Sequence, residues 1–300
     1  MATLATCTSS TRPAEGATGS AVGDMLYETD TSRTIVCSNA TGPVYKVFRS
    51  VSSPYPLDSS NTLTTRPVFH FDAALFDGLD AANNPADGTT ITDAVKWKCR
   101  ATGGRYEAFQ ATLANQPTFE TGGINGVPYV QLSNASNHYL DISTVAVCED
   151  DLTVFGITGP CPGARCTLIG DGASLGNRGV SDFIFGYGTG TEWYFYGDGQ
   201  SSGTPPINYS TAGAHPVFYI RDSGVTTTYG DGDNSGSNTG TNDRPMFLCQ
   251  IGGNPTYGHD GPMYEVAVWD SVLSDADLNA LGAYAIAKYG ASDTTFDPTF

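Results

Sequence analysis

The sequence has 300 residues, a length that suits one large all-β domain with a small additional module. It carries 14 basic and 31 acidic residues, and the net charge of −17 argues against nucleic acid and anionic membranes as partners. Only 15% of the residues are charged, whereas 36 are Gly and 17 are Pro, which is typical of short strands joined by tight turns.

The first segment, residues 1–50, contains three short apolar runs separated by turn-forming sequences. The runs lie within Val22–Thr31, at Thr34–Cys37 and at Val44–Phe48, and the pattern predicts a three-stranded β-meander. The segment has few large apolar residues, so we expect it to be stable only when it is docked on another surface.

Several positions of this segment follow one another in the order Arg-Pro, Val-Gly, an aromatic strand, Glu-Thr-Asp-Thr and a closing aromatic strand. In this order the segment resembles a small module found near the ends of phage tail, fibre and head-decoration proteins. The resemblance implies attachment to a virion. The attachment residues that it implies are Arg12, Pro13, Leu26, Tyr27, Tyr45 and Phe48.

Residues 51–66 are rich in Ser, Thr and Pro, lack periodicity and are predicted to be a linker. From residue 67 onward, short strand-like runs recur between stretches rich in Gly and Asn, which predicts two packed antiparallel sheets. The expected strands are Phe69–Asp72, Tyr129–Leu132, Tyr139–Ile142, Leu152–Ile157, Phe183–Tyr187, Trp193–Tyr196, Val217–Arg221, Val225–Tyr229, Met246–Ile251 and Met263–Trp269.

The last of these strands alternates apolar and other residues, so we expect it to bury one face at the edge of a sheet. A helix is predicted to follow it, with Ser274 as the N-cap and Gly290 as the stop. Its apolar face is expected to pack on the sheets, and residues 291–300 are expected to form a tail. The expected apolar face consists of Leu278, Leu281 and Ala285, with Ile286 and Tyr289 beside it.

Residues 67–290 also carry a longer resemblance. The stretches Phe69–Ala73, Gly88–Trp97, Gln110–Thr118, Asn125–Val130, Tyr139–Ile142 and Gly261–Asp275 occur in an order similar to that of the laminin-G-like branch of the concanavalin A-like lectins and glucanases. The resemblance implies an all-β, two-sheet antiparallel jelly-roll sandwich with one C-terminal α-helix. This fold hosts glycan binding, glycan cleavage, protein binding and scaffolding, so the fold alone does not choose among them.

Glucanases of this superfamily carry two carboxylates on one strand in a Glu-x-Asp-x-x-Glu pattern, and the sequence has no such pattern. Glu28-Thr-Asp30 lacks the second Glu, and Glu149-Asp150-Asp151 is a contiguous acidic turn. The four histidines stand in unrelated contexts, and His70 is expected to be structural. The sequence therefore predicts that the chain is not an enzyme, with a glycoside hydrolase as the third-ranked function.

The strongest candidate for a binding site is the stretch from Tyr229 to Asp243, which we expect to be one long loop. It combines carboxylates, amides and glycines, which suit Ca²⁺ or sugar hydroxyls, although the same residues are ordinary in a solvated hairpin. No cofactor is expected to be required, and Ca²⁺ stays open as a ligand. The candidate residues for a glycan or an ion are Tyr229, Asp231, Asp233, Asn234, Asn238 and Asp243.

The sequence has seven cysteines without zinc-finger spacing, and it begins without a secretory signal, so free thiols are the default expectation. Cys161 and Cys166 form the one close pair, and a disulfide between them would require oxidising surroundings.

The two resemblances together favour a virion structural protein on the capsid or tail surface, assembled in the host cytoplasm. Its expected partners are other virion proteins and copies of itself in a homotrimer, without nucleic acid or membrane insertion. The alternative is an adhesin that binds a host-surface glycan, with or without Ca²⁺.

Overall fold

The structure is a computed structural model of the chain. It describes the side chains of residues 55–104, 106–143, 151–160, 167–170, 216–223, 225, 227, 229, 248–253 and 258–290. For further strands, between residues 5 and 47 and between 144 and 247, it describes the backbone alone. The chain divides into two compact units, Met1–Arg66 and Pro67–Phe300.

The first unit contains a four-stranded sheet in the order β1-β2-β3-β4. Three of its strands form the expected antiparallel meander, and the fourth, β1, pairs in parallel with β2. Within residues 51–66, where a linker was expected, the structure contains a hairpin of β5 and β6, whose turn is held by Asp58. The strands are β1 (Ala5–Cys7), β2 (Met25–Glu28), β3 (Arg33–Cys37), β4 (Tyr45–Val47), β5 (Tyr55–Pro56) and β6 (Thr62–Leu63).

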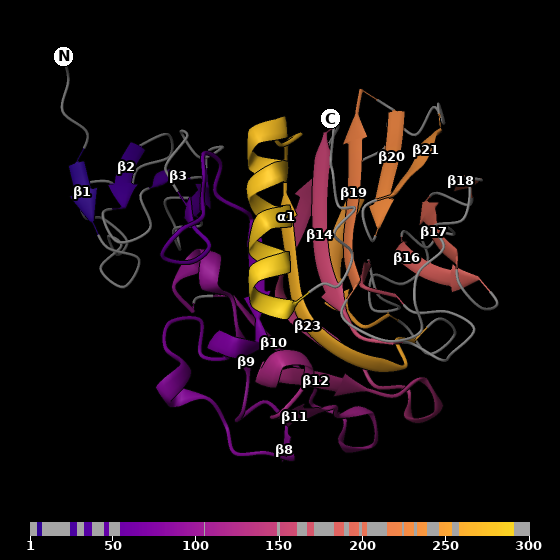
Figure 1. The fold of residues 1–300 in the computed structure, drawn as a ribbon. Coiled ribbons are helices and arrows are strands. Elements are labelled where there is room, and N and C mark those ends of the chain that lie inside the picture. Colours follow the sequence, from indigo (N-terminus) through magenta and orange to yellow (C-terminus); the bar gives the residue numbers. More distant parts are fainter. Residues whose placement is uncertain are drawn as a thin grey trace. The chain divides into compact units, whose positions relative to one another are not determined.

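The second unit is built on two sheets whose described strands all pair antiparallel, so the predicted all-β class is confirmed (Figure 1). The first sheet has the order β18-β17-β16-β15-β22-β13-β10-β9. Its strands are β9 (Trp97–Lys98), β10 (Glu107–Phe109), β13 (Leu140–Cys148), β15 (Ile169–Gly170), β16 (Phe183–Gly188), β17 (Glu192–Gly197), β18 (Gln200–Ser202) and β22 (Met246–Ile251).

The second sheet has the order β21-β20-β19-β14-β23-β12-β11-β8, with β7 also paired to β23. Its strands are β7 (Phe69–Asp72), β8 (Thr89–Thr90), β11 (Thr118–Glu120), β12 (Tyr129–Leu132), β14 (Leu152–Thr158), β19 (His215–Asp222), β20 (Val225–Gly230), β21 (Asp233–Asn238) and β23 (Gly261–Trp269). Short 3-10 turns in the described chain lie at Ala73–Leu75, Ala81–Asn83, Arg100–Thr102, Leu113–Asn115, Ile124–Gly126 and Asn134–Ser136.

Aromatic side chains fill the space between the two sheets. Phe71 of β7 lies 5.6 Å, between ring centroids, from Trp97 of β9, and Phe69 lies 5.7 Å from Tyr106. Phe69, Phe71 and Trp97 are fully buried, and burying each such side chain stabilises the fold by about 1.5 to 3 kcal/mol. Because side chains alternate along a strand, His70 and Asp72 must point to the other face of β7.

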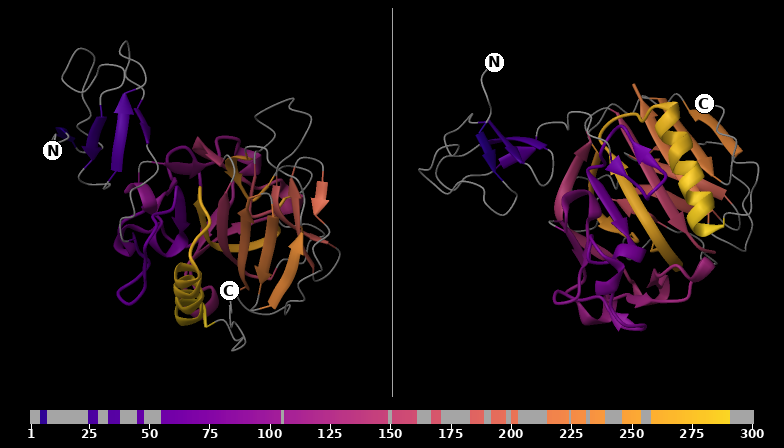
Figure 2. Two further views of the ribbon diagram at one scale, coloured as in Figure 1. Left: turned by 90° about the horizontal axis from the view of Figure 1, so that it is seen from above. Right: turned by 60° about the vertical axis from the view of Figure 1, so that its left-hand side comes forward.

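That outer face is covered in part by the single α-helix among the described residues, α1 (Asp275–Tyr289). In Figure 1 the helix runs beside β14 and β23, and the right view of Figure 2 shows it in front of the sheet. The predicted caps are confirmed, because Ser274 Oγ accepts a hydrogen bond from Asp277 N and Gly290 adopts a left-handed φ of 61°. No helix in the described part of the chain is long and apolar enough to cross a lipid bilayer.

Two expectations about this region were wrong. β23 is not an edge strand, because it lies between β14 on one side and β7 and β12 on the other, and both of its faces are buried. The helix covers the face that a sequence pattern assigns to solvent, so Glu265 has no exposed surface. Ile286 is 38% exposed, while Tyr284, which the periodicity did not single out, is buried.

Candidate functional site

Two features of the outer face of the second sheet combine chemically active side chains. The first is a buried network under α1, and the second is an open groove beside the N-terminal end of the helix. They share one sheet face. Ile220 pairs with Thr153, and Thr153 pairs with Trp269. Trp269 lies two positions along β23 from Ala267, which pairs with His70 of the network, so all these side chains point to the same face.

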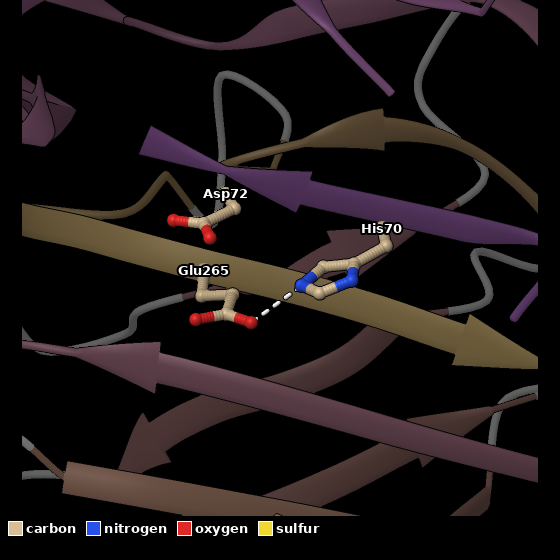
Figure 3. A group of neighbouring side chains, drawn as sticks. All are labelled: His70, Asp72 and Glu265. Carbon is tan, nitrogen blue, oxygen red and sulfur yellow. Dashed lines mark hydrogen bonds and ion pairs between the residues drawn. The ribbon is translucent and has the colours of Figure 1, made fainter. Parts of the chain in front are cut away.

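The buried network is centred on Glu265. In the pairing of β7 with β23, Asp72 lies directly opposite Glu265, and His70 lies two residues before Asp72 on the same face. Figure 3 shows the three side chains gathered over the strands, with the His70 imidazole bonded through Nε2 to the Glu265 carboxylate. All three side chains are buried.

The helix supplies the remaining partners of these carboxylates. Tyr284 and Tyr289 donate their hydroxyls to Glu265 Oε2 at 2.9 Å and 2.7 Å, and Lys288 Nζ lies 3.2 Å from the same oxygen. Lys288 Nζ also lies 2.8 Å from Asp72 Oδ2. The network therefore connects the last turns of the helix to two neighbouring strands.

The electrostatic setting of the network follows from these contacts. Burial alone would raise the pKa of the Glu265 carboxyl, but the charge of Lys288 and the contact with His70 hold that pKa well below its usual range. Burial also opposes the charge of Lys288, but Asp72 and Glu265 raise the pKa of its ammonium above the usual value. The Glu265 carboxyl and the Lys288 ammonium are thus both ionised across the neutral range.

His70, Asp72 and Glu265 are the one group among the described residues that can hold a metal ion, with one ligand atom of each within 4.8 Å of the others. The Lys288 ammonium, however, contacts both carboxylates and already supplies the positive charge that they require. The residues thus fit an internal ion-pair network better than a metal centre. Its role is to hold α1 on the sheet.

The open groove lies over β19 and β20 and has a volume of about 580 Å³. Alternation along β20 points Val225, Thr227 and Tyr229 to this face, and all three are half-buried. The far wall comes from the turn before α1 and from the first turn of the helix. The lining residues are Ile220, Asp222, Ser223, Val225, Thr227, Tyr229, Val272, Leu273, Asp275 and Leu278.

The groove combines an aromatic ring, aliphatic side chains and oxygen-bearing groups. Burial raises the pKa of the Tyr229 hydroxyl, and the nearby negative charge of Asp275 raises it further. Asp222 and Asp275 are exposed, and Ser223 Oγ donates a hydrogen bond of 3.0 Å to Asp222 Oδ1. An open site of this composition can stack on a planar face and accept hydrogen bonds from hydroxyl groups.

Of the predicted binding residues, the structure describes the side chain of Tyr229 alone. Tyr229 lines the groove, whereas residues 233–238 form strand β21 rather than part of a long loop. They do so because Tyr229 pairs with Asn234 and Gly230 with Asp233 in a hairpin. The side chains of Asp233, Asn234 and Asn238 lie outside the described residues, as do Asp231 and Asp243.

The predicted attachment residues are placed only in part. Leu26 and Tyr27 lie on β2 and Tyr45 lies on β4, but their side chains are outside the described residues, as are Arg12, Pro13 and Phe48. Cys161 and Cys166 also lie outside the described part of the chain.

Sequence reasoning missed Asp222 and Asp275, which are more than 50 positions apart, and it missed the roles of Glu265, Tyr284 and Lys288. One signal was available for the helix residues, because Tyr284 and Lys288 are four positions apart and therefore share a helix face.

No protein-family model matches the sequence, and the search of curated proteins gives no match. Among solved structures, the chain is similar to Trypanosoma rangeli sialidase in complex with 2,3-difluoro-KDN, with 14% identity and a TM-score of 0.45. That match covers 88% of this chain and 44% of the sialidase, so the chain spans less than half the length of that structure.

A second similar structure is domain 4 of an extracellular arabinanase from Geobacillus stearothermophilus in complex with arabinotriose. Its identity is 16%, the TM-score is 0.45, and the match covers 72% of this chain and 98% of that domain. A third is a carbohydrate-binding module of a Ruminococcus gnavus sialidase bound to α2,3 sialyllactose, with 12% identity, a TM-score of 0.37, and coverage of 46% and 84% respectively. Such low identities concern the fold alone.

The expectation that the chain is not an enzyme needs correction. Solved structures with a similar fold include a sialidase, which is an enzyme, and one domain of an arabinanase. The expectation rested on the absence of one paired-carboxylate motif, and that motif is not required throughout glycosidases, since sialidases use a tyrosine nucleophile. The missing motif therefore gives no ground for placing the chain outside the enzymes.

Proposed function

We propose that the second unit binds a carbohydrate in the groove beside Tyr229. The observation that carries the proposal is the composition of this groove, which combines a half-buried aromatic ring with two exposed carboxylates on an open sheet face. The proposal concerns binding and holds whether or not the bound sugar is also cleaved.

Each part of the groove suits a sugar. The ring of Tyr229 offers an apolar face on which the C–H face of a pyranose can stack, while its hydroxyl can form a hydrogen bond. Asp222 and Asp275 accept hydrogen bonds from sugar hydroxyls, and Val225 and Val272 supply apolar contact. The volume of about 580 Å³ lies in the usual range for small-molecule sites, roughly 300 to 1,000 Å³.

The buried network supports this site indirectly. Asp275 belongs to the first turn of α1, and Val272 and Leu273 belong to the turn that leads into it. The far wall of the groove is therefore positioned by the helix, and the helix is held by Lys288 and Glu265 at its other end.

The experiment is a glycan array followed by isothermal titration calorimetry on the strongest ligand. We expect Tyr229→Ala to weaken binding by about tenfold or more, which corresponds to about 1.4 kcal/mol. Tyr139→Ala is the matched control, because Tyr139 is also half-buried but precedes a strand of the other sheet, and it should bind as the wild type does. Wild-type affinity in Tyr229→Ala, or no binding to any glycan, would refute the proposal.

We further propose where the site is displayed. Residues 1–50 attach the chain to a virion, and the chain displays the groove on the surface of that virion. Its support is the ordered residue pattern of the first segment, which resembles phage attachment modules. Assembly in the host cytoplasm, contacts with other virion proteins and a homotrimer belong to the same proposal. Co-sedimentation of the full chain with purified particles tests it, and we expect Tyr27→Asp to abolish co-sedimentation.

A further inference from the structure

The charged side chains that line the groove have one sign. Asp222 stands at the end of β19 and Asp275 in the first turn of α1, and both are exposed. Among the described residues, no Lys, Arg or His lines the groove. A ligand in the groove therefore meets two carboxylates and no cation on its described walls.

Neighbouring residues add to the negative charge of the groove. Asp151, at the start of β14, accepts a hydrogen bond of 3.1 Å from Ser223 N, which places a third carboxylate at the same rim. Arg221 stands between Ile220 and Asp222 on β19, but strand alternation sends its side chain to the opposite face, where it is fully buried. The nearest cation in the sequence thus cannot reach the ligand.

We propose that this groove selects uncharged saccharides and discriminates against anionic ones, such as sialylated or uronic-acid glycans. The inference rests on the proposed carbohydrate binding and specifies its ligand class. Proteins that bind a carboxylated sugar need a cationic partner for it, most effectively the planar fork of an arginine. On the described walls of the groove a sugar carboxylate has no such partner and is repelled by Asp222 and Asp275.

The size of the effect follows from Coulomb's law. At the separations of a small groove, each like-charge contact in a mostly aqueous setting weakens binding by roughly threefold to fivefold. Two carboxylates together predict discrimination of about tenfold or more against the anionic ligand. The discrimination should shrink with salt, because the Debye length falls from about 10 Å at 0.1 M to about 3 Å at 1 M.

The test uses the full chain on an array of matched pairs, each consisting of a neutral oligosaccharide and its sialylated counterpart. The dissociation constants of both members of each pair are measured at 0.05 M and 0.5 M NaCl. We expect the neutral member to bind about tenfold or more tightly at low salt, and the ratio to fall at high salt. If no glycan binds, the proposed function fails and this inference fails with it. If both members bind equally, or the sialylated member binds better, the inference is overturned while carbohydrate binding stands.

Variants identify the cause of the discrimination. Asp222→Asn combined with Asp275→Asn should bring the ratio of the two dissociation constants close to one, while Asp93→Asn, an exposed aspartate outside the groove, should leave it unchanged. An unchanged ratio in the double variant would overturn the inference, because the carboxylates would then not be the source of the selectivity.

Discussion

Replacement of Lys288 by methionine tests the network that holds α1 on the sheet. The substitution keeps an unbranched side chain, shorter by one heavy atom, and removes its charge. Lys288 Nζ lies 2.8 Å from Asp72 Oδ2 and 3.2 Å from Glu265 Oε2, and its side chain is 18% exposed. Its loss leaves two buried carboxylates opposite each other on adjacent strands.

The magnitude follows from these distances. With an effective dielectric constant of about 20, Coulomb's law gives roughly 5 to 6 kcal/mol for each of the two ion pairs. The cost of removing the ammonium from water offsets much of this gain. We therefore expect the free energy of unfolding to fall by about 3 to 5 kcal/mol at pH 7, as is usual when one partner of a buried pair is removed.

The stability lost in Lys288→Met should decrease as the pH falls. In the wild type the folded pKa of Glu265 lies below its unfolded value of about 4.3, so its ion pairs contribute stability above that pH and lose it as pH falls through the folded pKa. In Lys288→Met the Glu265 carboxylate binds protons more readily, because the charge of Lys288 that lowers its pKa is gone. The difference in stability between the two proteins should therefore narrow by about 1 kcal/mol or more between pH 7 and pH 4.

Urea unfolding followed by tryptophan fluorescence measures this difference, because all three tryptophans, at positions 97, 193 and 269, lie in the second unit. Lys96→Met is the control. Its ion pair with Glu107 has a similar length, 2.9 Å, but both side chains are more than a quarter exposed, so its removal should cost less than about 1 kcal/mol. A loss in Lys288→Met no larger than in this control would refute the reasoning.

Three further changes probe the sandwich and the helix. Phe71→Ala should lower the free energy of unfolding by about 3 to 5 kcal/mol in urea titrations. Leu113→Ala, at an 83% exposed position, should change it by less than about 0.5 kcal/mol. Equal effects of the two substitutions would contradict the assigned core. Ser274→Ala should lower the free energy of unfolding by about 1 kcal/mol and speed amide exchange at Asp277. An unchanged exchange rate would contradict the assignment of Ser274 as the N-cap. Gly290→Ala should lower the stability by about 1 to 2 kcal/mol because φ is 61°, and Gly290→Asn should lower it less; the reverse order would argue against the left-handed cap.

Most strands and the helix were predictable because their signals are local. Apolar alternation marked β7 and β12 within the residues that form them, and Ser274 and Gly290 marked both ends of α1. The local pattern failed at β23, where one face was expected to be buried but Glu265 on the other face is buried as well. Its burial depends on a helix that follows later in the chain, and a single-strand pattern carries no information about such a cover.

The candidate site was predictable only at Tyr229. Turn-forming residues after it suggested a long loop, but Asp233 and Asn234 pair back onto β20 and extend the sheet. Asp222 and Asp275 come from separate elements, and only the docking of α1 brings them to one groove. Their juxtaposition is a property of tertiary packing, which explains why no motif in the sequence revealed it.

The most direct test of carbohydrate binding is a crystal structure of the full chain soaked with the neutral oligosaccharide that binds most tightly on the array. The account predicts electron density for a sugar ring stacked on Tyr229, with hydroxyls within hydrogen-bond distance of Asp222 or Asp275. Density for the sugar at another surface, with the groove beside Tyr229 free of it, would contradict the central claim.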